Sequence, residues 1–405
     1  MKDNRIHSVD ALRGFSLAGI VIVHMVENFI GSMPPADAMA AANQGILDSI
    51  VEGFIFLFLR GKFFALFSFL FGLSFFIQMD KANQKGLRFE GRFLWRLILL
   101  LIIGALHHMF YRGDILTIYA LLGVFLIPFY KLKPKYILVV TGLLLLGAGR
   151  YLTFALFGSQ SLFSGVEFTP DNPAIIAYFN ILKNGNLLEV FASNTQEGHL
   201  MKLDFQLGVF GRGYLTFAFF LLGLYAGKLK FFETFRDYRK KLFEALYISI
   251  GLLLIAFVLM GFLFYLGSKE GGQGTPDFES WTTMFALSAY DLSNLFMTFI
   301  IVIGFLLFYM KPRGERFLNK FKAYGRMALT NYFAQTIIGT AILYGWGMGY
   351  IGELRNIYTF LIGLGIILLQ MLFSSWWLSN FKYGPLEWLW RSLTYFKFFP
   401  FKKNQ

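Results

Sequence analysis

The first apolar segment of the chain reads Arg5-Ile-His-Ser-Val-Asp-Ala-Leu-Arg-Gly-Phe-Ser-Leu-Ala-Gly-Ile-Val-Ile-Val-His-Met-Val-Glu-Asn-Phe29. It is apolar enough to cross a bilayer, yet it carries Asp10, Arg13, His24 and Glu27. At about 100° per residue, Arg13 and His24 lie roughly 20° apart on a helix, and both carboxylates lie within roughly 60° of them. A polar stripe therefore follows one helix face. Charges at membrane depth are costly, so His24 and Glu27 are functional candidates, whereas interfacial positions are the alternative for Asp10 and Arg13.

The composition indicates an integral membrane protein. Hydrophobic residues make up 56% of the chain and charged residues only 15%, whereas a soluble protein is about one quarter charged. The formal net charge is +13, but the basic residues fall in short clusters between apolar runs, as the positive-inside rule produces. No predicted helix or loop concentrates them enough for a nucleic-acid groove. We therefore exclude nucleic acid and expect membrane lipids as neighbours.

The chain has no cysteine, which excludes disulfides, thiolate metal sites and thiol nucleophiles. Its five histidines show no HExxH or His-x-His spacing, so we predict no metal cofactor. We also expect no cleavable signal peptide, because the first apolar run is too long and carries charges.

Ten segments are predicted to span the membrane, since a span needs about 20 apolar residues. They are residues 11–31, 55–79, 92–111, 114–131, 136–157, 208–228, 242–266, 283–310, 326–348 and 354–379. The connections rich in Lys and Arg are 1–13, 80–96, 131–135, 228–241, 311–326 and the tail 397–403, and those poor in them are 32–54, 158–207, 267–282 and 349–353. This alternation predicts an all-α transmembrane bundle over residues 1–380 with both termini cytoplasmic.

Residues 46–79 are too long for one perpendicular span, and Arg60-Gly-Lys62 interrupts them. One alternative is a re-entrant or interfacial helix at 46–59 followed by a span, and the other is a single long tilted helix. In the outer connection 158–207, residues 174–191 are predicted to form a helix that lies over the outer mouth of the bundle.

Residues 381–405 are predicted to be a cytoplasmic amphipathic segment. Its core, Gly384-Pro-Leu-Glu-Trp-Leu-Trp-Arg391, is amphipathic and aromatic, which is typical of a helix lying at the membrane interface.

The third predicted span ends near His107, His108 and Asp114, which the topology places on the outer side. His24 lies in the outer half of the first span, so these groups are expected to converge. A histidine beside a carboxylate is how a general base is oriented. The alternative is that the two histidines are interfacial and Asp114 caps the fourth span.

The ninth predicted span carries Asn331 and Gln335 four residues apart on one face, and Arg326 lies at its cytoplasmic end. The polar pair serves either a ligand or hydrogen bonds between helices. Arg60 and Lys62 are also expected at the cytoplasmic interface if residues 46–59 are re-entrant. Several cations at that mouth suit a phosphate-bearing ligand, although lipid headgroups attract the same charges.

Five motifs, spread in order over nearly the whole chain, resemble those of the YeiB-like family of bacterial membrane proteins. They are Ser8-Val-Asp-Ala-Leu-Arg-Gly14, Gly61-Lys-Phe-Phe-Ala-Leu-Phe-Ser-Phe-Leu-Phe-Gly72, Gly113-Asp-Ile-Leu116 with Tyr119-Ala120, Gly325-Arg-Met-Ala-Leu-Thr-Asn-Tyr332 and Gly384-Pro-Leu-Glu-Trp-Leu-Trp-Arg391.

That family is similar to the transmembrane acyltransferases, including heparan-glucosaminide acetyltransferases and polysaccharide O-acyltransferases. The resemblance implies a multi-pass protein of the bacterial inner membrane. It also implies acyl transfer from cytoplasmic acyl-CoA to an acceptor, often a sugar, on the far side. The O-acyltransferase relatives carry an Arg or Lys, ten residues and then a His in the first span, which Arg13 and His24 match. A His before Gly113-Asp114 is also a family feature, and either His107 or His108 fits it.

The first functional hypothesis is therefore a membrane acyltransferase. In this hypothesis His24 deprotonates an acceptor hydroxyl or briefly carries the acyl group, and Glu27 or Asp114 orients the His24 ring. Arg13, Arg326 and Lys62 bind the CoA phosphates. The acceptor is a small molecule or a glycan. The second hypothesis is a proton-coupled transporter or lipid-handling protein that uses the same polar stripe. A structural or signalling membrane protein is the third. The sequence leaves a homodimer open.

Overall fold

The computed structural model describes residues 6–166, 172–271 and 276–403, and in this part of the chain the only β-type contact is an isolated bridge between Phe381 and Lys402. The helices are α1 (His7–Val26), α2 (Ala36–Ala42), α3 (Ile46–Phe54), α4 (Lys62–Asn83), α5 (Glu90–Phe110), α6 (Leu116–Tyr130), α7 (Pro134–Leu145), α8 (Ala148–Phe157), α9 (Pro173–Asn184), α10 (Leu187–Ser193), α11 (His199–Leu207), α12 (Arg212–Lys228), α13 (Phe231–Thr234), α14 (Arg239–Glu270), α15 (Trp281–Tyr309), α16 (Pro312–Leu318), α17 (Lys322–Arg326), α18 (Ala328–Leu343), α19 (Asn356–Asn380) and α20 (Pro385–Tyr395). Two π-helical turns, Ile55–Leu59 and Asn194–Gly198, lie between α3 and α4 and between α10 and α11.

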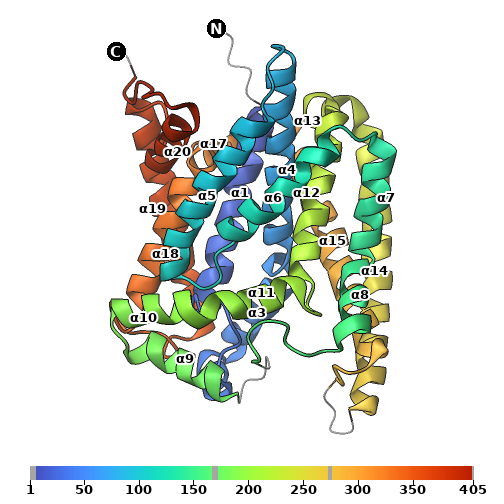
Figure 1. The fold of residues 1–405 in the computed structure, drawn as a ribbon, viewed down its shortest axis with the longest axis vertical. Coiled ribbons are helices and arrows are strands. Elements are labelled where there is room, and N and C mark those ends of the chain that lie inside the picture. The colour runs from blue at the N-terminus through green and yellow to red at the C-terminus, as the bar shows by residue number, and fades with distance from the viewer. Residues whose placement is uncertain (1–5, 167–171, 272–275, 404–405) are drawn as a thin grey trace.

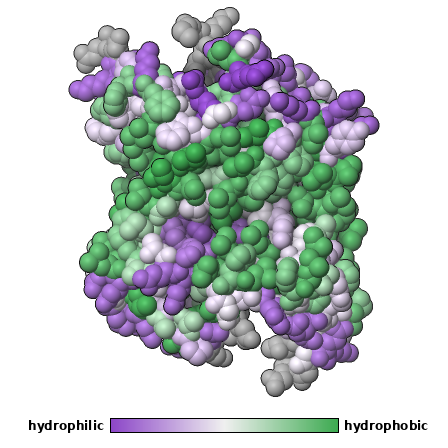
Figure 2. All heavy atoms as spheres, in the orientation of Figure 1, coloured by the Kyte–Doolittle hydropathy of each residue, from purple (hydrophilic) through white to green (hydrophobic). Residues whose placement is uncertain are grey.

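The prediction of an all-α membrane protein is confirmed. Each of the ten predicted spans is helical, and Figure 2 shows an apolar belt between two hydrophilic ends. Six helical segments in the described residues are long and apolar enough to span a membrane, and the number rises to eight if α7–α8 and the segment from α10 to α12 each count as one bent span. The other two predicted spans, α6 and α18, have 15 and 16 residues. Their lengths support fewer than ten full spans.

Both ends of the chain lie at the same end of the bundle (Figure 1). This end, which we call the basic end, holds the first turn of α1, the start of α5, α13 and α20. The opposite end holds α3, α9 and α10. The connections rich in Lys and Arg therefore gather at the basic end, and its cytoplasmic location stays a prediction from the positive-inside rule.

Residues 46–83 form one nearly continuous helical segment of 38 residues. It changes from α3 through a π-helical turn to α4, and the chain breaks regular helix at Arg60-Gly61. Gly61 has φ +81°, a left-handed conformation that a glycine adopts without steric cost. The structure therefore supports one long interrupted helix over a re-entrant segment.

Three helices, α9, α10 and α11, cross the opposite end of the bundle and lie across the direction of the long helices (Figure 1). The single helix predicted over 174–191 is therefore two helices, because the chain breaks at Gly185-Asn186. The Asn186 side chain accepts from the backbone of Leu188 and Glu189, while Glu189 accepts from the Asn186 backbone, which is a capping box. This local signal starts α10.

Helix α20 packs on the start of α5 through tryptophan and arginine side chains. The Trp95 Nε1–H donates to the Leu393 carbonyl at 3.1 Å, and the Trp390 Nε1–H donates to the Arg96 carbonyl at 3.0 Å. The Arg96 guanidinium lies 3.5 Å from the centre of the Trp390 ring. These contacts explain why the amphipathic end of the chain is a helix fixed to the bundle.

Glu387 of α20 caps α18, a helix to which it is not connected locally. Its Oε1 accepts from the backbone of Leu329 at 2.7 Å and Thr330 at 3.1 Å, and its Oε2 accepts from the Thr330 hydroxyl at 2.6 Å. Amide groups in the first turn of a helix have no partner within it. Burial raises the pKa of the Glu387 carboxyl, so this cap is held in a site that disfavours its charge.

Replacing Glu387 by alanine is expected to lower the free energy of unfolding by about 1–3 kcal/mol, because two backbone amides and one hydroxyl lose their acceptor. Thermal unfolding of the purified protein in detergent measures the change. Glu353→Ala is the matched control, since Glu353 is exposed and lies 3.5 Å from Lys183, a pair worth about 0–1 kcal/mol. Equal losses in both variants would contradict the capping role.

Candidate functional site

The candidate site begins at the short loop between α5 and α6, where Asp114 is fully buried. Its carboxylate accepts from the backbone of Leu116 at 3.1 Å and Thr117 at 2.9 Å, and from the Thr117 hydroxyl at 2.7 Å. Asp114 therefore caps α6, as the alternative interpretation of the sequence predicted. These donors also stabilise the ionised carboxylate.

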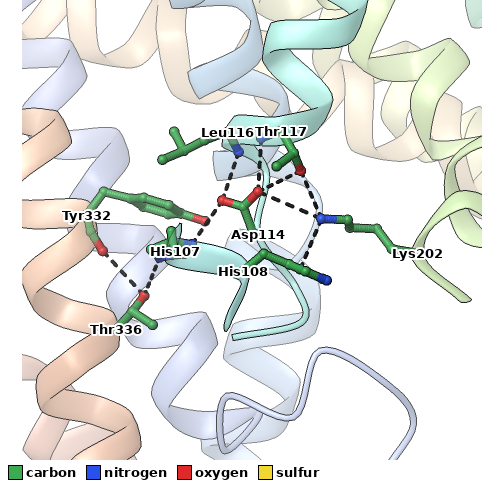
Figure 3. A network of polar contacts seen from close by, with 8 residues as sticks. All are labelled: His107, His108, Asp114, Leu116, Thr117, Lys202, Tyr332 and Thr336. Carbon is green, nitrogen blue, oxygen red and sulfur yellow. Dashed lines mark hydrogen bonds and ion pairs between the residues drawn. The ribbon is translucent and has the colours of Figure 1, made fainter. Parts of the chain in front are cut away.

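The Asp114 carboxylate also lies beside His107, in addition to capping α6 (Figure 3). Asp114 Oδ1 lies 2.9 Å from His107 Nδ1, and the His107 Nε2 atom lies 2.8 Å from the Thr336 hydroxyl on α18. The Tyr332 ring stacks on the His107 ring, with centres 4.7 Å apart. A carboxylate on one ring nitrogen fixes the tautomer and leaves the other nitrogen as the basic one. His107 and Asp114 are therefore close enough for an oriented general base, although His107 Nδ1 makes no hydrogen bond of regular geometry in the described structure.

His108 points to the other side of the loop and contacts Lys202 of α11. The Lys202 ammonium is 3.1 Å from His108 Nδ1 and 2.8 Å from the Thr117 hydroxyl, and it lies 3.8 Å from Asp114 Oδ2. Since an ammonium only donates, His108 accepts at Nδ1 and donates from Nε2 to the Asn194 carbonyl at 2.9 Å. His108 is therefore neutral and orients Lys202, which separates its role from that of His107.

Neither Lys202 nor Thr336 was predicted to be a site residue, and Tyr332 appeared only as the last residue of a family motif. Lys202 lies in a connection otherwise poor in basic residues, and this isolated cation was the available signal. Thr336 and Tyr332 reach the site only because α18 packs beside the end of α5. In the described residues, no group of three or more His, Asp, Glu and Cys side chains could hold a metal ion.

His24 lies near this cluster but makes different contacts. Its ring centre is 5.0 Å from that of Tyr111, 5.1 Å from that of Phe29 and 6.3 Å from that of Tyr332. Its Nδ1 is buried without a hydrogen-bond partner in the described structure. The expectation that Glu27 or Asp114 orients His24 is not what the structure shows, because Asp114 contacts His107.

Glu27 instead contacts the interruption between α3 and α4. Arg60 donates from Nε to Glu27 at 2.6 Å and from Nη1 to Glu52 at 2.9 Å. Lys62 is buried, and its ammonium donates to the Phe56 carbonyl at 2.6 Å. Because Glu27 follows the last turn of α1, Arg60 and Lys62 lie at the opposite end from Arg13. We expected them at the cytoplasmic mouth only for a re-entrant segment, and the structure instead places them away from Arg13.

The basic end does hold the other predicted cations. Arg13 donates to Asp10 at 2.9 Å and to the Ser74 hydroxyl at 3.1 Å, and Arg326 lies near the Lys382 carbonyl, 3.5 Å away. Helices α1 and α17 approach closely here, because a Cβ on Gly14 would lie 2.9 Å from the Gly325 backbone nitrogen. The motif in α1 and the motif at α17 are thus in direct contact.

A cavity of about 740 Å³ opens among these residues and extends into the bundle. The basic side chains that line it are Arg13, Lys81, Arg96, Lys230, Arg326 and Arg391, and the acidic ones are Asp10, Asp80, Glu233 and Glu387. Its deeper wall is mainly aromatic and aliphatic and includes Leu116, Tyr119 and Tyr332. Tyr332 stacks on His107 and also faces His24, so one ring lies between the cavity and both histidines.

Asn331 and Gln335, the polar pair on α18, differ in their hydrogen bonding. Asn331 donates to the Ser374 hydroxyl at 2.9 Å and to the Tyr324 carbonyl at 3.2 Å, which joins α18 to α19. Of the two predicted roles, Asn331 therefore has the hydrogen bonds between helices. Gln335 is fully buried, and neither of its amide atoms has a hydrogen-bond partner in the described structure.

Comparison with known proteins identifies relatives over the full chain. The family model "Protein of unknown function (DUF418)" matches residues 214–397. The protein YeiB of Escherichia coli (strain K12), described as uncharacterised, is 30% identical over 402 residues, which cover 96% of this chain and 95% of YeiB. The chain belongs to the YeiB-like family. YxaH of Bacillus subtilis (strain 168), also described as uncharacterised, is 31% identical over 423 residues, which cover 100% of this chain and 98% of YxaH.

A third relative of this YeiB-like protein, the "39.9 kDa protein in amylase 3'region" of Bacillus acidopullulyticus, is 29% identical over 98% of this chain and 96% of its own length. The part matched by the DUF418 model runs from α12 to α20 and contains Tyr332 and Thr336, whereas His107, Asp114 and Lys202 precede it. The candidate site therefore joins both halves of the YeiB-like chain.

Proposed function

We propose that this YeiB-like protein is an acyltransferase of the bacterial inner membrane. In this proposal an acyl-CoA enters from the basic, cytoplasmic end, and its acyl group passes to a hydroxyl-bearing acceptor such as a sugar. The observation that carries the proposal is the cavity lined by six cations and four carboxylates, whose lining includes the Tyr332 ring stacked on His107. Charge-assisted hydrogen bonds from arginine and lysine are the usual recognition of phosphate groups.

The residues divide the reaction between them. Asp114 holds the His107 Nδ1–H, which leaves Nε2 as the proton acceptor once a substrate hydroxyl replaces that of Thr336. The acceptor oxygen gives its proton to Nε2 and forms a bond to the thioester carbonyl carbon. The carbon–sulfur bond then breaks, and the CoA sulfur takes the proton from Nε2. The products are the acylated acceptor and CoA thiol, and His107 returns to its starting state. General-base catalysis of this kind contributes about 10²- to 10⁴-fold in rate.

The test is release of CoA thiol by purified protein in lipid nanodiscs, measured with acetyl-CoA and longer acyl-CoAs and with a panel of sugars. Thiol release that depends on an acceptor, together with an acylated product detected by mass spectrometry, is the expected result. Specific binding of a solute without thiol release for any acyl-CoA would favour the transport hypothesis instead.

The donor-binding part of the proposal has its own test. Lys81→Gln together with Arg326→Gln is expected to raise KM for acyl-CoA about tenfold while kcat stays unchanged, because each lost charged hydrogen bond weakens donor binding. Arg236→Gln is the control, since Arg236 is exposed at the same end and pairs with Glu315 rather than lining the cavity. An unchanged KM in the double variant would place the donor elsewhere.

A further inference from the structure

Arg112 is a buried cation without a counter-ion in the described structure. It follows α5 in the loop that carries Asp114, and only 2% of its surface is exposed. Its Nη1 donates to the Met201 sulfur at 3.2 Å, and its Nε is buried without a partner. A thioether is a weak acceptor. A guanidinium in this position is costly unless it is paired with an anion.

The surroundings of Arg112 add positive charge rather than remove it. Both Arg112 and Lys202 lie within electrostatic range of His108. Asp114, which lies 3.8 Å from the Lys202 ammonium, also contacts His107 and the first turn of α6. Asp204, on the same helix as Lys202, accepts from the backbone and hydroxyls of the loop around Ser164. The described cluster thus retains at least one uncompensated buried positive charge.

The backbone around Arg112 is also shaped for close approach. The guanidinium lies 3.3 Å from the centre of the Tyr178 ring, and a Cβ on Gly198 would lie 2.7 Å from its Nε. Gly198 ends the π-helical turn whose first residue, Asn194, accepts from His108. Single π-helical turns occur frequently at functional sites. Stacking on Tyr178 supports the guanidinium from one face and leaves its edge donors for another group.

We propose that Arg112 and Lys202 form a subsite for an anionic group, a carboxylate or a phosphate, on the molecule that reaches His107. The assignment of this anion to the acyl acceptor rests on the proposed function, whereas its binding does not. The acceptor class is therefore an acidic sugar, a phosphorylated sugar or the headgroup of an anionic lipid. In Figure 2 a hydrophilic area interrupts the apolar belt at the level of α11, the helix that carries Lys202.

Anion binding is tested by the thermal unfolding of purified protein without any acyl-CoA. One arm adds sodium phosphate or glucuronate, compared with sodium chloride at equal ionic strength. The other compares nanodiscs of phosphatidylglycerol with nanodiscs of phosphatidylcholine. Wild type is expected to be stabilised in at least one arm, and Arg112→Gln is expected to bind the same probe at least tenfold more weakly. Stabilisation in the first arm alone indicates a soluble acceptor, and stabilisation in the second alone indicates a lipid.

A second measurement separates an anion subsite from a purely structural arginine. Without added anion, Arg112→Met is expected to unfold at the same temperature as wild type or higher, because a hydrophobic residue of similar length removes an unpaired buried charge. A clear fall in that temperature, or equal anion binding by wild type and Arg112→Gln, overturns the proposal. The control is Lys183→Gln, which removes an exposed cation from the same end of the bundle. Loss of anion binding with normal thiol release would contradict the acceptor assignment alone.

Discussion

Purified His107→Gln protein is expected to release CoA about 10²- to 10⁴-fold more slowly than wild type at saturating acyl-CoA and acceptor. Glutamine can keep one hydrogen bond to Asp114 or Thr336, but it has no basic nitrogen. The loss is therefore expected in kcat, while KM for acyl-CoA stays near the wild-type value because His107 does not line the cavity. A stopped assay of free thiol measures both constants.

His24→Gln is the matched control for His107, because both rings contact the Tyr332 ring. His24 has no carboxylate at hydrogen-bond distance in the described structure, so its replacement is expected to reduce kcat far less. The opposite ranking, with His24→Gln inactive and His107→Gln active, would return the catalytic role to the residue that the ten-residue spacing indicated. Thermal unfolding of both variants shows whether a fall in kcat is accompanied by a loss of stability.

Arg150→Leu is expected to lower the free energy of unfolding by about 3–5 kcal/mol, because it leaves Asp291 as an unpaired buried charge. Arg150 on α8 donates to the Val209 carbonyl at 2.7 Å and the Ser288 hydroxyl at 2.7 Å, and it pairs with Asp291 on α15. Both partners are at least 90% buried. The change is measured by thermal or denaturant unfolding in detergent.

The double variant Arg150→Leu/Asp291→Leu is expected to recover much of that loss, since replacing both members of a buried pair by apolar residues is often neutral. Arg236→Leu, which breaks an exposed pair with Glu315 at 3.2 Å, is expected to cost no more than about 1 kcal/mol. A loss in Arg150→Leu as small as that of Arg236→Leu would mean that the buried pair contributes little.

The sequence was sufficient to predict the helical membrane bundle, because long apolar runs can satisfy their backbone in lipid only as helices. It was not sufficient for the breaks within those runs. Residues 136–157 are two helices bent by 50°, with Gly147 at φ +97° between them. A glycine inside an apolar run is compatible with a straight helix or a break, and packing against other helices decides which one forms.

The candidate site could be predicted only in part. His107, His108 and Asp114 are close in sequence, so their proximity followed from the chain itself. Which histidine meets the carboxylate depends on the turn after α5, and Lys202 arrives from a helix more than 80 residues later. Arg60 was misplaced because a charge inside an apolar run was assigned by its neighbours in sequence rather than by its partner, Glu27.

The cap that Glu387 gives to α18 has a consequence for how the chain is made. Translation produces Leu329 and Thr330 almost 60 residues before their acceptor, so α18 enters the membrane with its first amides uncapped. Those amides stay without this partner until the last turns of the chain have left the ribosome. A nascent chain stopped before α20 therefore lacks the carboxylate that accepts from the first amides of α18.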